Sequence, residues 1–242
     1  LLLDLYMPEC TGFELAQMIR QVKAYVSLPI VYLSSETDRE KQLEAVGLGG
    51  DDFLTKPIRP DHLISAVTSR IERYRQLQSL MLHDSLTGLL NHTTARERLD
   101  QEVAHAGRDG APLALAMIDL DQFKHVNDTY GHATGDRVLK SIAHLLSRRL
   151  RRSDIIGRYG GEEFIVVLPN TNLATARDLM NELRDAFGRI RHVSDGKDFG
   201  VTLSCGIAAF PEKATLVDLA EAADQALYVA KRQGRNQVAV AK

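Results

Sequence analysis

The sequence predicts an α/β protein in two parts joined by a long helix. Over residues 1–59, short apolar strands alternate with helical segments, which indicates βαβ units and a parallel sheet. Residues 60–83 read as one amphipathic helix. The second part, 84–242, contains an apolar strand at 113–119 that ends in carboxylates, and an apparent β-hairpin at 155–169 that carries two glutamates. We therefore expect the chemistry of the second part where these strands end.

The composition is that of a globular protein whose net charge is close to zero. The chain of 242 residues is long enough for one large domain or two ordinary ones, each with its own core. Its residues are 44% hydrophobic and 26% charged, and its formal net charge is -2. This balance gives no sign of a nucleic-acid or membrane binder, and we expect neither a signal peptide nor a membrane span. Cys10 and Cys205 lie far apart in apolar contexts. We expect buried thiols without a metal role and a reducing, cytoplasmic location.

The strands predicted in the first part end in polar residues. "LLLDL", "PIVYLSS" and "DDFLTKP" read as strands, with helices over "GFELAQMIRQV" and "DREKQLEAVGLG" between them. In parallel sheets, chemistry gathers at the carboxyl ends of the strands. Those ends carry Asp4, Ser34 and Lys56, which suit an acceptor carboxylate, a phosphoryl-oxygen ligand and a charge partner.

These segments resemble the C-terminal half of a response-regulator receiver domain, a flavodoxin-like parallel sheet. The resemblance implies that Asp4 accepts a phosphoryl group, that Ser34 is the switch hydroxyl and that Lys56 is the charge partner. It also implies an upstream sensor histidine kinase. The first strand of the family, with the acidic pair that holds Mg²⁺, is not in these 242 residues. We expect a partial receiver that belongs to a longer natural protein.

The connecting helix carries an apolar stripe. At a and d heptad spacing the residues are apolar except for Gln78: Ile64, Val67, Ile71, Tyr74 and Met81. One interpretation is a coiled-coil seam between two protomers. The other is an amphipathic last receiver helix that packs on its own domain. We favour the seam, because the stripe continues past what a receiver alone would use.

Two pairs of carboxylates mark the second part. Asp119 and Asp121 lie two residues apart at the end of the 113–119 strand, on the same face. Such neighbours raise one another's pKa unless a cation neutralises them, and an all-oxygen ligand set favours Mg²⁺ or Mn²⁺ over zinc. Glu162 and Glu163 form the second pair on the hairpin, which we expect to lie against this strand. The two pairs would then meet.

Four motifs of the second part occur in a specific order: "DSLTGLLN", "DLDQFKHVNDTYGHATGD", "RYGGEEF" and "ADQALYVAKRQGRNQV". Over residues 84–242 they resemble the GGDEF family of diguanylate cyclases, here in its GGEEF form. The resemblance implies an α+β domain with a polymerase-palm-like antiparallel sheet. It also implies condensation of two GTP molecules into cyclic di-GMP with release of two pyrophosphates. Each domain holds one GTP, so the resemblance implies a homodimer.

Catalytic and metal roles follow from the resemblance. Mg²⁺ or Mn²⁺ would be bound by Asp119, the backbone carbonyl of Leu120, Glu162 and Glu163. It remains open whether Glu163 completes the metal site or assists deprotonation of the attacking hydroxyl. Two glycines lie at the turn of the hairpin, Gly160 and Gly161. They would let the backbone approach the ribose and α-phosphate.

The resemblance also implies residues that bind GTP and its product. Asn127 and Asp136 would read the guanine edge. The outer phosphates would meet the backbone amides of Phe123 and Lys124 and the side chains of Lys231 and Arg235. In "RRSD", Arg151 and Asp154 match the R-x-x-D product-inhibition motif, although charged residues before a strand are the alternative interpretation. The second arginine of such a site is unassigned, with Arg177 and Arg184 as candidates.

Several residues have structural interpretations. Asp84 and Arg158 are expected to pair and to anchor the domain start to the hairpin. His132 is expected to order its loop, and His92 stands where the family usually has Arg. Other functions are a catalytically silent cyclic di-GMP receptor, a cyclase for a mixed purine dinucleotide and a structural adaptor. The intact signature and Asp136 favour a diguanylate cyclase regulated by receiver phosphorylation and product inhibition.

Overall fold

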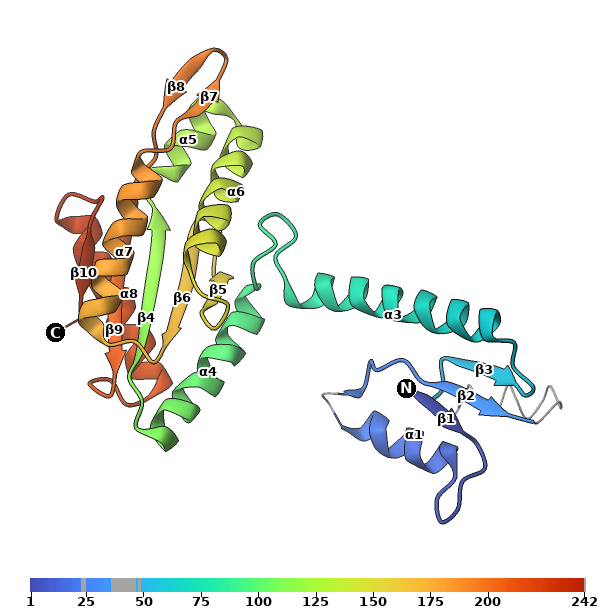
Figure 1. Cartoon of the computed structure of the whole chain (residues 1–242). Coiled ribbons are helices and arrows are strands. Elements are labelled where there is room, and N and C mark those ends of the chain that lie inside the picture. The colour runs from blue at the N-terminus through green and yellow to red at the C-terminus, as the bar shows by residue number, and fades with distance from the viewer. Residues whose placement is uncertain (23–24, 36–46, 48, 242) are drawn as a thin grey trace. The chain divides into compact units, whose positions relative to one another are not determined.

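The computed structural model describes residues 1–22, 25–35, 47 and 49–241. The chain consists of two compact units, residues 1–81 and 82–242 (Figure 1). Among the described residues, no helix is both long enough and apolar enough to cross a membrane.

The first unit contains a three-stranded parallel sheet in the order β1-β2-β3. Its elements are β1 (Leu2–Asp4), α1 (Gly12–Gln21), β2 (Val31–Ser34), β3 (Asp52–Thr55) and α3 (Pro60–Leu82). Leu3, Leu5, Ala16, Ile30 and Tyr32 form its small core. The parallel sheet expected here is therefore confirmed. Most of the helix expected over 38–49 lies outside the described residues. Cys10 is only half-buried, so our expectation of two buried thiols was wrong for this residue.

The helix expected at 60–83 is α3, and within the described structure it buries none of its residues. Three members of its apolar stripe are exposed to a large extent: Ile64 by 65%, Ile71 by 40% and Met81 by 66%. Its first half is tied to the sheet, because Arg70 pairs with Asp52 of β3 at 2.5 Å. An exposed stripe is what a seam between two protomers would cover, and that seam stays a prediction.

The second unit has a five-stranded sheet in the order β10-β9-β4-β6-β5. Its strands are β4 (Leu113–Leu120), β5 (Ile155–Arg158), β6 (Glu163–Pro169), β9 (Leu203–Phe210) and β10 (Val238–Val240). All neighbours in it are antiparallel except β9 and β10. The separate hairpin of this unit consists of β7 (His192–Ser194) and β8 (Lys197–Phe199). The expected antiparallel sheet is present.

Helices cover both faces of this sheet (Figure 1). They are α4 (His92–Asp109), α5 (Phe123–Tyr130), α6 (His132–Arg149), α7 (Leu173–Gly188) and α8 (Leu216–Arg232). On β4, Ala116 and Ile118 pack in the core that α5, α6 and α7 share, and Leu115 and Met117 pack in the core of α4 and α8. Every residue of β4 is buried, which explains why this strand is apolar without alternation until Asp119.

Candidate active site

The two acidic pairs meet at the end of β4. Asp119 lies directly opposite Glu163 in the antiparallel register of β4 and β6. The backbone amide of Leu120 donates to the carbonyl of Glu162 at 3.2 Å, which continues the pairing past the strand. The expectation that the glutamate hairpin lies against this strand is confirmed.

The turn of the hairpin is tight around Gly160. The amide of Tyr159 donates to the carbonyl of Glu163 at 2.8 Å. A Cβ added at Gly160 would lie 2.5 Å from Oε2 of Glu163, whereas one added at Gly161 would meet no atom within 4 Å. The absence of a side chain at Gly160 therefore leaves the space that the Glu163 carboxylate occupies. The ring of His92 lies 4.3 Å from that of Tyr159, so this departure from the family places an aromatic contact behind the turn.

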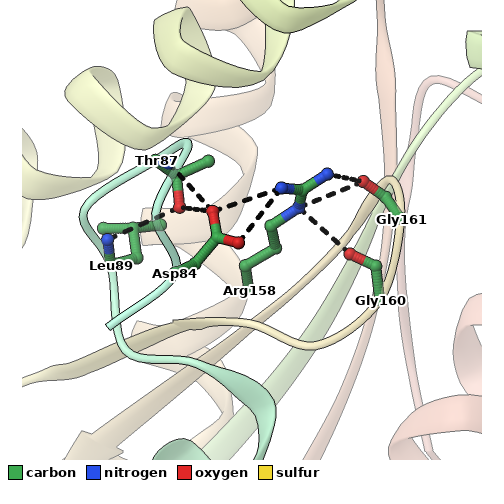
Figure 2. Close-up of polar contacts among 6 residues, drawn as sticks. All are labelled: Asp84, Thr87, Leu89, Arg158, Gly160 and Gly161. Carbon is green, nitrogen blue, oxygen red and sulfur yellow. Dashed lines mark hydrogen bonds and ion pairs between the residues drawn. The ribbon is translucent and has the colours of Figure 1, made fainter. Parts of the chain in front are cut away.

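The guanidinium of Arg158 binds the backbone of the glycine turn and the carboxylate of Asp84 (Figure 2). Its Nη2 donates to the carbonyl of Gly161 at 2.7 Å, and its Nε donates to the carbonyls of Gly160 and Gly161, both at 3.2 Å. Its Nη1 donates to both carboxylate oxygens of Asp84 at 3.2 Å. Asp84 also accepts from the amide and hydroxyl of Thr87 at 2.9 and 2.6 Å. The expected pairing of Asp84 with Arg158 is confirmed, and it connects the start of the domain to the glycine turn.

Asp119, Glu162 and Glu163 form an acidic cluster, whose negative charge Lys231 and Arg235 neutralise only in part. Asp119 is 5% exposed, and burial raises its pKa, aided by the charge of Asp121. Lys231 and Arg235 oppose that rise, and the Lys231 ammonium lies 2.6 Å from Oδ2 of Asp119. Burial also raises the pKa of Glu162, with Asp119 and Glu163 adding to the effect. Such carboxylates favour a cation or another positive group close by.

The carboxylate of Asp121, by contrast, is surrounded by neutral hydrogen-bond donors. Its carboxylate accepts from the hydroxyls of Thr202 and Ser204, both at 2.7 Å, and from the amide of Asn236 at 3.0 Å. The two hydroxyls come from the start of β9, and the amide comes from the segment after α8. Asp121 raises the pKa of Asp119, so the two carboxylates interact as the sequence predicted, although neutral donors occupy the oxygens of Asp121. Sequence reasoning missed Thr202, Ser204 and Asn236, whose only signal was their polarity at strand ends.

The donor set suits a hard divalent cation. Asp119 and Glu162 have raised pKa values, and Glu163 is their neighbour across the register. Oxygen ligands of this kind fit Mg²⁺ or Mn²⁺. Among the described residues, no three His, Cys, Asp or Glu side chains are already arranged to hold a metal ion. The expected set includes the carbonyl of Leu120, and Lys231 takes one oxygen of Asp119, so binding would require Lys231 to move.

Helices α5 and α6 place the residues expected at the nucleotide. A Cβ at Gly135 would overlap Oδ1 of Asn127, so the Asn127 side chain packs against the first turn of α6, next to exposed Asp136. At the start of α5, Gln122 is left-handed with φ 55° and makes no side-chain cap. The amides of the first turn, which include those of Phe123 and Lys124, therefore have no cap from Gln122.

The product-inhibition motif forms a local turn. Oδ2 of Asp154 accepts from the backbone amide of Arg151 at 2.7 Å, and the Arg151 side chain is exposed. Of the two candidates for a second arginine, Arg184 donates to Asn236 and pairs with Asp185 at 2.6 Å. Arg177 likewise pairs with its neighbour Asp178, at 2.9 Å, so the second arginine of this site stays unassigned.

The residues expected at the receiver site lie at the ends of neighbouring strands. Asp4 is opposite Leu33, the residue before Ser34, and Lys56 follows β3. Asp4 and Lys56 form an ion pair, and Ser34 is 2% exposed. The hydrogen bond from Lys56 is the main cause that lowers the pKa of Asp4, with the amide of Tyr6 contributing. The three polar groups thus lie at one edge of the sheet.

The second unit is thus a palm-like sheet flanked by helices, with an acidic hairpin beside a buried strand-end carboxylate. The family described as Diguanylate cyclase, GGDEF domain, matches residues 81–237, and the Response regulator receiver domain matches residues 1–68. The chain belongs to the GGDEF family and carries a receiver region before it.

Individual relatives agree with this assignment. The chain is 47% identical to the diguanylate cyclase DgcP of Pseudomonas aeruginosa over 73% of its length and 26% of DgcP. It is 35% identical to the response regulator PleD of Caulobacter vibrioides over 94% of its length and 53% of PleD. The GGDEF domain of DgcB from Caulobacter crescentus, solved in complex with c-di-GMP, aligns with a TM-score of 0.65 and 34% identity, covering 67% of this chain and 94% of that one. The chain thus spans between about a quarter and about half of these two curated relatives.

Proposed function

We propose that the chain is a diguanylate cyclase that condenses two GTP molecules into cyclic di-GMP and releases two pyrophosphates. The observation that carries this proposal is the meeting of Asp119 with Glu163 beside a glycine turn, with the Lys231 ammonium 2.6 Å from the Asp119 carboxylate. Acidic groups with raised pKa values and cationic side chains at one place suit phosphoryl transfer. DgcP and DosC, both named diguanylate cyclases, are 47% identical to this chain over 176 residues and 40% identical over 159 residues.

In the proposed reaction, the 3′-oxygen of each GTP forms a bond to the α-phosphorus of the other, and the bond from each α-phosphorus to pyrophosphate breaks. Two phosphodiester bonds thus close the ring, and two pyrophosphates leave. Asn127 and Asp136 bind the guanine edge, and Asp136 accepts from the guanine N1–H and amino group. The amides at the start of α5, with Lys231 and Arg235, meet the outer phosphates. The backbone at Gly160 and Gly161 lies along the ribose and α-phosphate, which positions the reacting atoms.

Asp119, the Leu120 carbonyl, Glu162 and Glu163 would hold Mg²⁺ or Mn²⁺. A divalent ion there supplies positive charge that stabilises the attacking and leaving oxygens. Lys231 keeps Asp119 neutralised when no ion is bound, since its ammonium lies 2.6 Å from that carboxylate. Glu163, held over Gly160, is the group placed either to complete this ligand set or to accept the proton of the 3′-hydroxyl.

Because each domain binds one GTP, we propose that the enzyme works as a homodimer in which two sites face each other. The exposed stripe of α3 is the proposed seam, and phosphorylation of Asp4 by a sensor histidine kinase would shift the dimer toward a productive arrangement. Arg151 and Asp154 would bind cyclic di-GMP as an inhibitor. We place the reaction in the cytoplasm, where free thiols such as Cys10 and Cys205 persist.

The test is the initial rate of cyclic di-GMP formation from GTP and Mg²⁺ at several protein concentrations. We expect product, with a rate that rises faster than linearly in protein. Asp119→Asn should lower the rate about 10²-fold or more, because it removes one of the charges that face the reacting phosphates. Asp100→Asn, which changes an exposed acid on α4, is the matched control. No product at any concentration, with cyclic di-GMP still bound, would instead indicate a receptor.

A further inference from the structure

Asp121 is a buried carboxylate with a full set of neutral partners. Its side chain lies at the end of β4, and the residue is 7% exposed. The donors come from two other places: the hydroxyls of Thr202 and Ser204 at 2.7 Å, and the amide of Asn236 at 3.0 Å. A buried charge is stabilised when hydrogen bonds replace its water. Asp121 therefore connects β4 to β9 and to the segment that follows α8.

That segment has an unusual backbone. Arg235 and Asn236 are consecutive non-glycine residues with left-handed φ values of 63° and 46°. Each such residue costs about 1–2 kcal/mol, so surrounding contacts must hold it. Asn236 is held from two sides. Its amide donates to Asp121, and its carbonyl and Oδ1 accept from Nη1 of Arg184 at 2.8 and 3.0 Å.

Arg235 follows directly from this held backbone and is solvent-exposed. Its charge partly offsets the rise in the pKa of Asp119. Arg235 also lines a cavity of about 420 Å³ together with Asp121, Gln122 and Thr202. Gln122 precedes the uncapped amides of α5. Arg235 thus lines the same cavity as Asp121 and as Gln122, the residue before the helix start proposed for the outer phosphates.

We infer that Asp121 and Arg184 are positioning residues, which hold Asn236 so that Arg235 projects toward the outer phosphates of the substrate. Asp121 acts through hydrogen bonds to Asn236 and is not a metal ligand. This inference rests on the proposed function, since it assigns the nucleotide triphosphate to the space that Arg235 faces. It separates the two aspartates of "DLD" into a metal-site residue and a brace for the phosphate site.

Equilibrium binding of 3′-deoxy-GTP tests the inference, because this analogue lacks the attacking hydroxyl and is not consumed. In the full chain, Asp121→Asn keeps the side-chain volume and replaces one accepting oxygen by a donor. We expect about tenfold weaker binding of 3′-deoxy-GTP, a loss of about 1.4 kcal/mol. Binding of GMP, which lacks the outer phosphates, and of Mn²⁺ alone should stay within twofold of wild type. Asp198→Asn, an exposed acid on β8, is the control.

Arg235→Ala separates positioning from a general structural effect. In that background, Asp121→Asn should weaken 3′-deoxy-GTP binding less than twofold, because the group that it positions is gone. If Asp121→Asn does not fold, Arg184→Gln takes its place and should show the same pattern. Weaker Mn²⁺ binding, equal losses for GMP and 3′-deoxy-GTP, additivity with Arg235→Ala, or behaviour like the control would each overturn the inference. A wild-type chain that binds no 3′-deoxy-GTP would instead refute the proposed function.

Discussion

Removal of the Arg158 side chain is expected to loosen the glycine turn and destabilise the second unit. Arg158 and Asp84 are largely buried, with side-chain exposures of 18% and 21%. Arg158→Met keeps an apolar stem but leaves the carbonyls of Gly160 and Gly161 and part of Asp84 without their donor. Hydrogen bonds to charged groups contribute about 1.5–3 kcal/mol, and Asp84 keeps its bonds to Thr87. We expect a loss of about 2 kcal/mol, or about 4–8 °C in Tm.

The assay combines urea unfolding with amide hydrogen exchange of a peptide that spans residues 158–163. Arg158→Met should raise exchange in this peptide and lower the rate of GTP conversion, whereas Arg96→Met, at an exposed position of α4, should change neither exchange nor stability. In a double-mutant cycle with Asp84→Asn, we expect a coupling of about 1–2 kcal/mol. The reasoning is refuted if Arg158→Met matches Arg96→Met in exchange and stability, or if the cycle shows no coupling.

Three further changes test the acidic site. Gly160→Ala would bring a Cβ to 2.5 Å from the Glu163 carboxylate. That carboxylate must then move by about 1 Å, which should lower the rate about 10²-fold with little change in Tm. In Gly161→Ala the new Cβ meets no protein atom, so a lower rate there reports contact with bound nucleotide. Glu162→Gln should raise Tm at pH 7, because ionising a group whose folded-state pKa is raised costs stability as pH rises from about 4.3 through that pKa. The gain should vanish below that window, and a gain independent of pH contradicts the assignment.

Much of the second unit could be predicted because its signals are local. The unbroken apolar run that ends in Asp119 predicts a strand covered on both faces, and β4 is buried along its whole length. The two glycines before Glu162 predict a turn with acidic residues, and the hairpin lies against β4 in register. In each case a few adjacent residues contain the whole signal.

The contacts that distinguish neighbouring carboxylates were not predictable. Asp119 and Asp121 look equivalent in the sequence, yet Lys231 of α8 lies at Asp119, whereas Asp121 accepts from β9 and from Asn236. Arg184, a candidate for the inhibitory site, instead donates to Asn236. These partners are far away along the chain, and no local pattern marks them.

By itself, the sequence determined the parallel strands of the first part, the strand that ends in Asp119, the glutamate hairpin, the family, and the residue types that gather at the strand ends. Periodicity and motif spacing carry that information, because secondary structure follows short-range patterns. Only the tertiary structure showed that Lys231 lies at Asp119, whereas Asp121 accepts from two hydroxyls and a backbone amide. The physical reason is that the charge state and availability of a carboxylate depend on burial and on donors within hydrogen-bonding distance, and here folding brings those donors from separate elements.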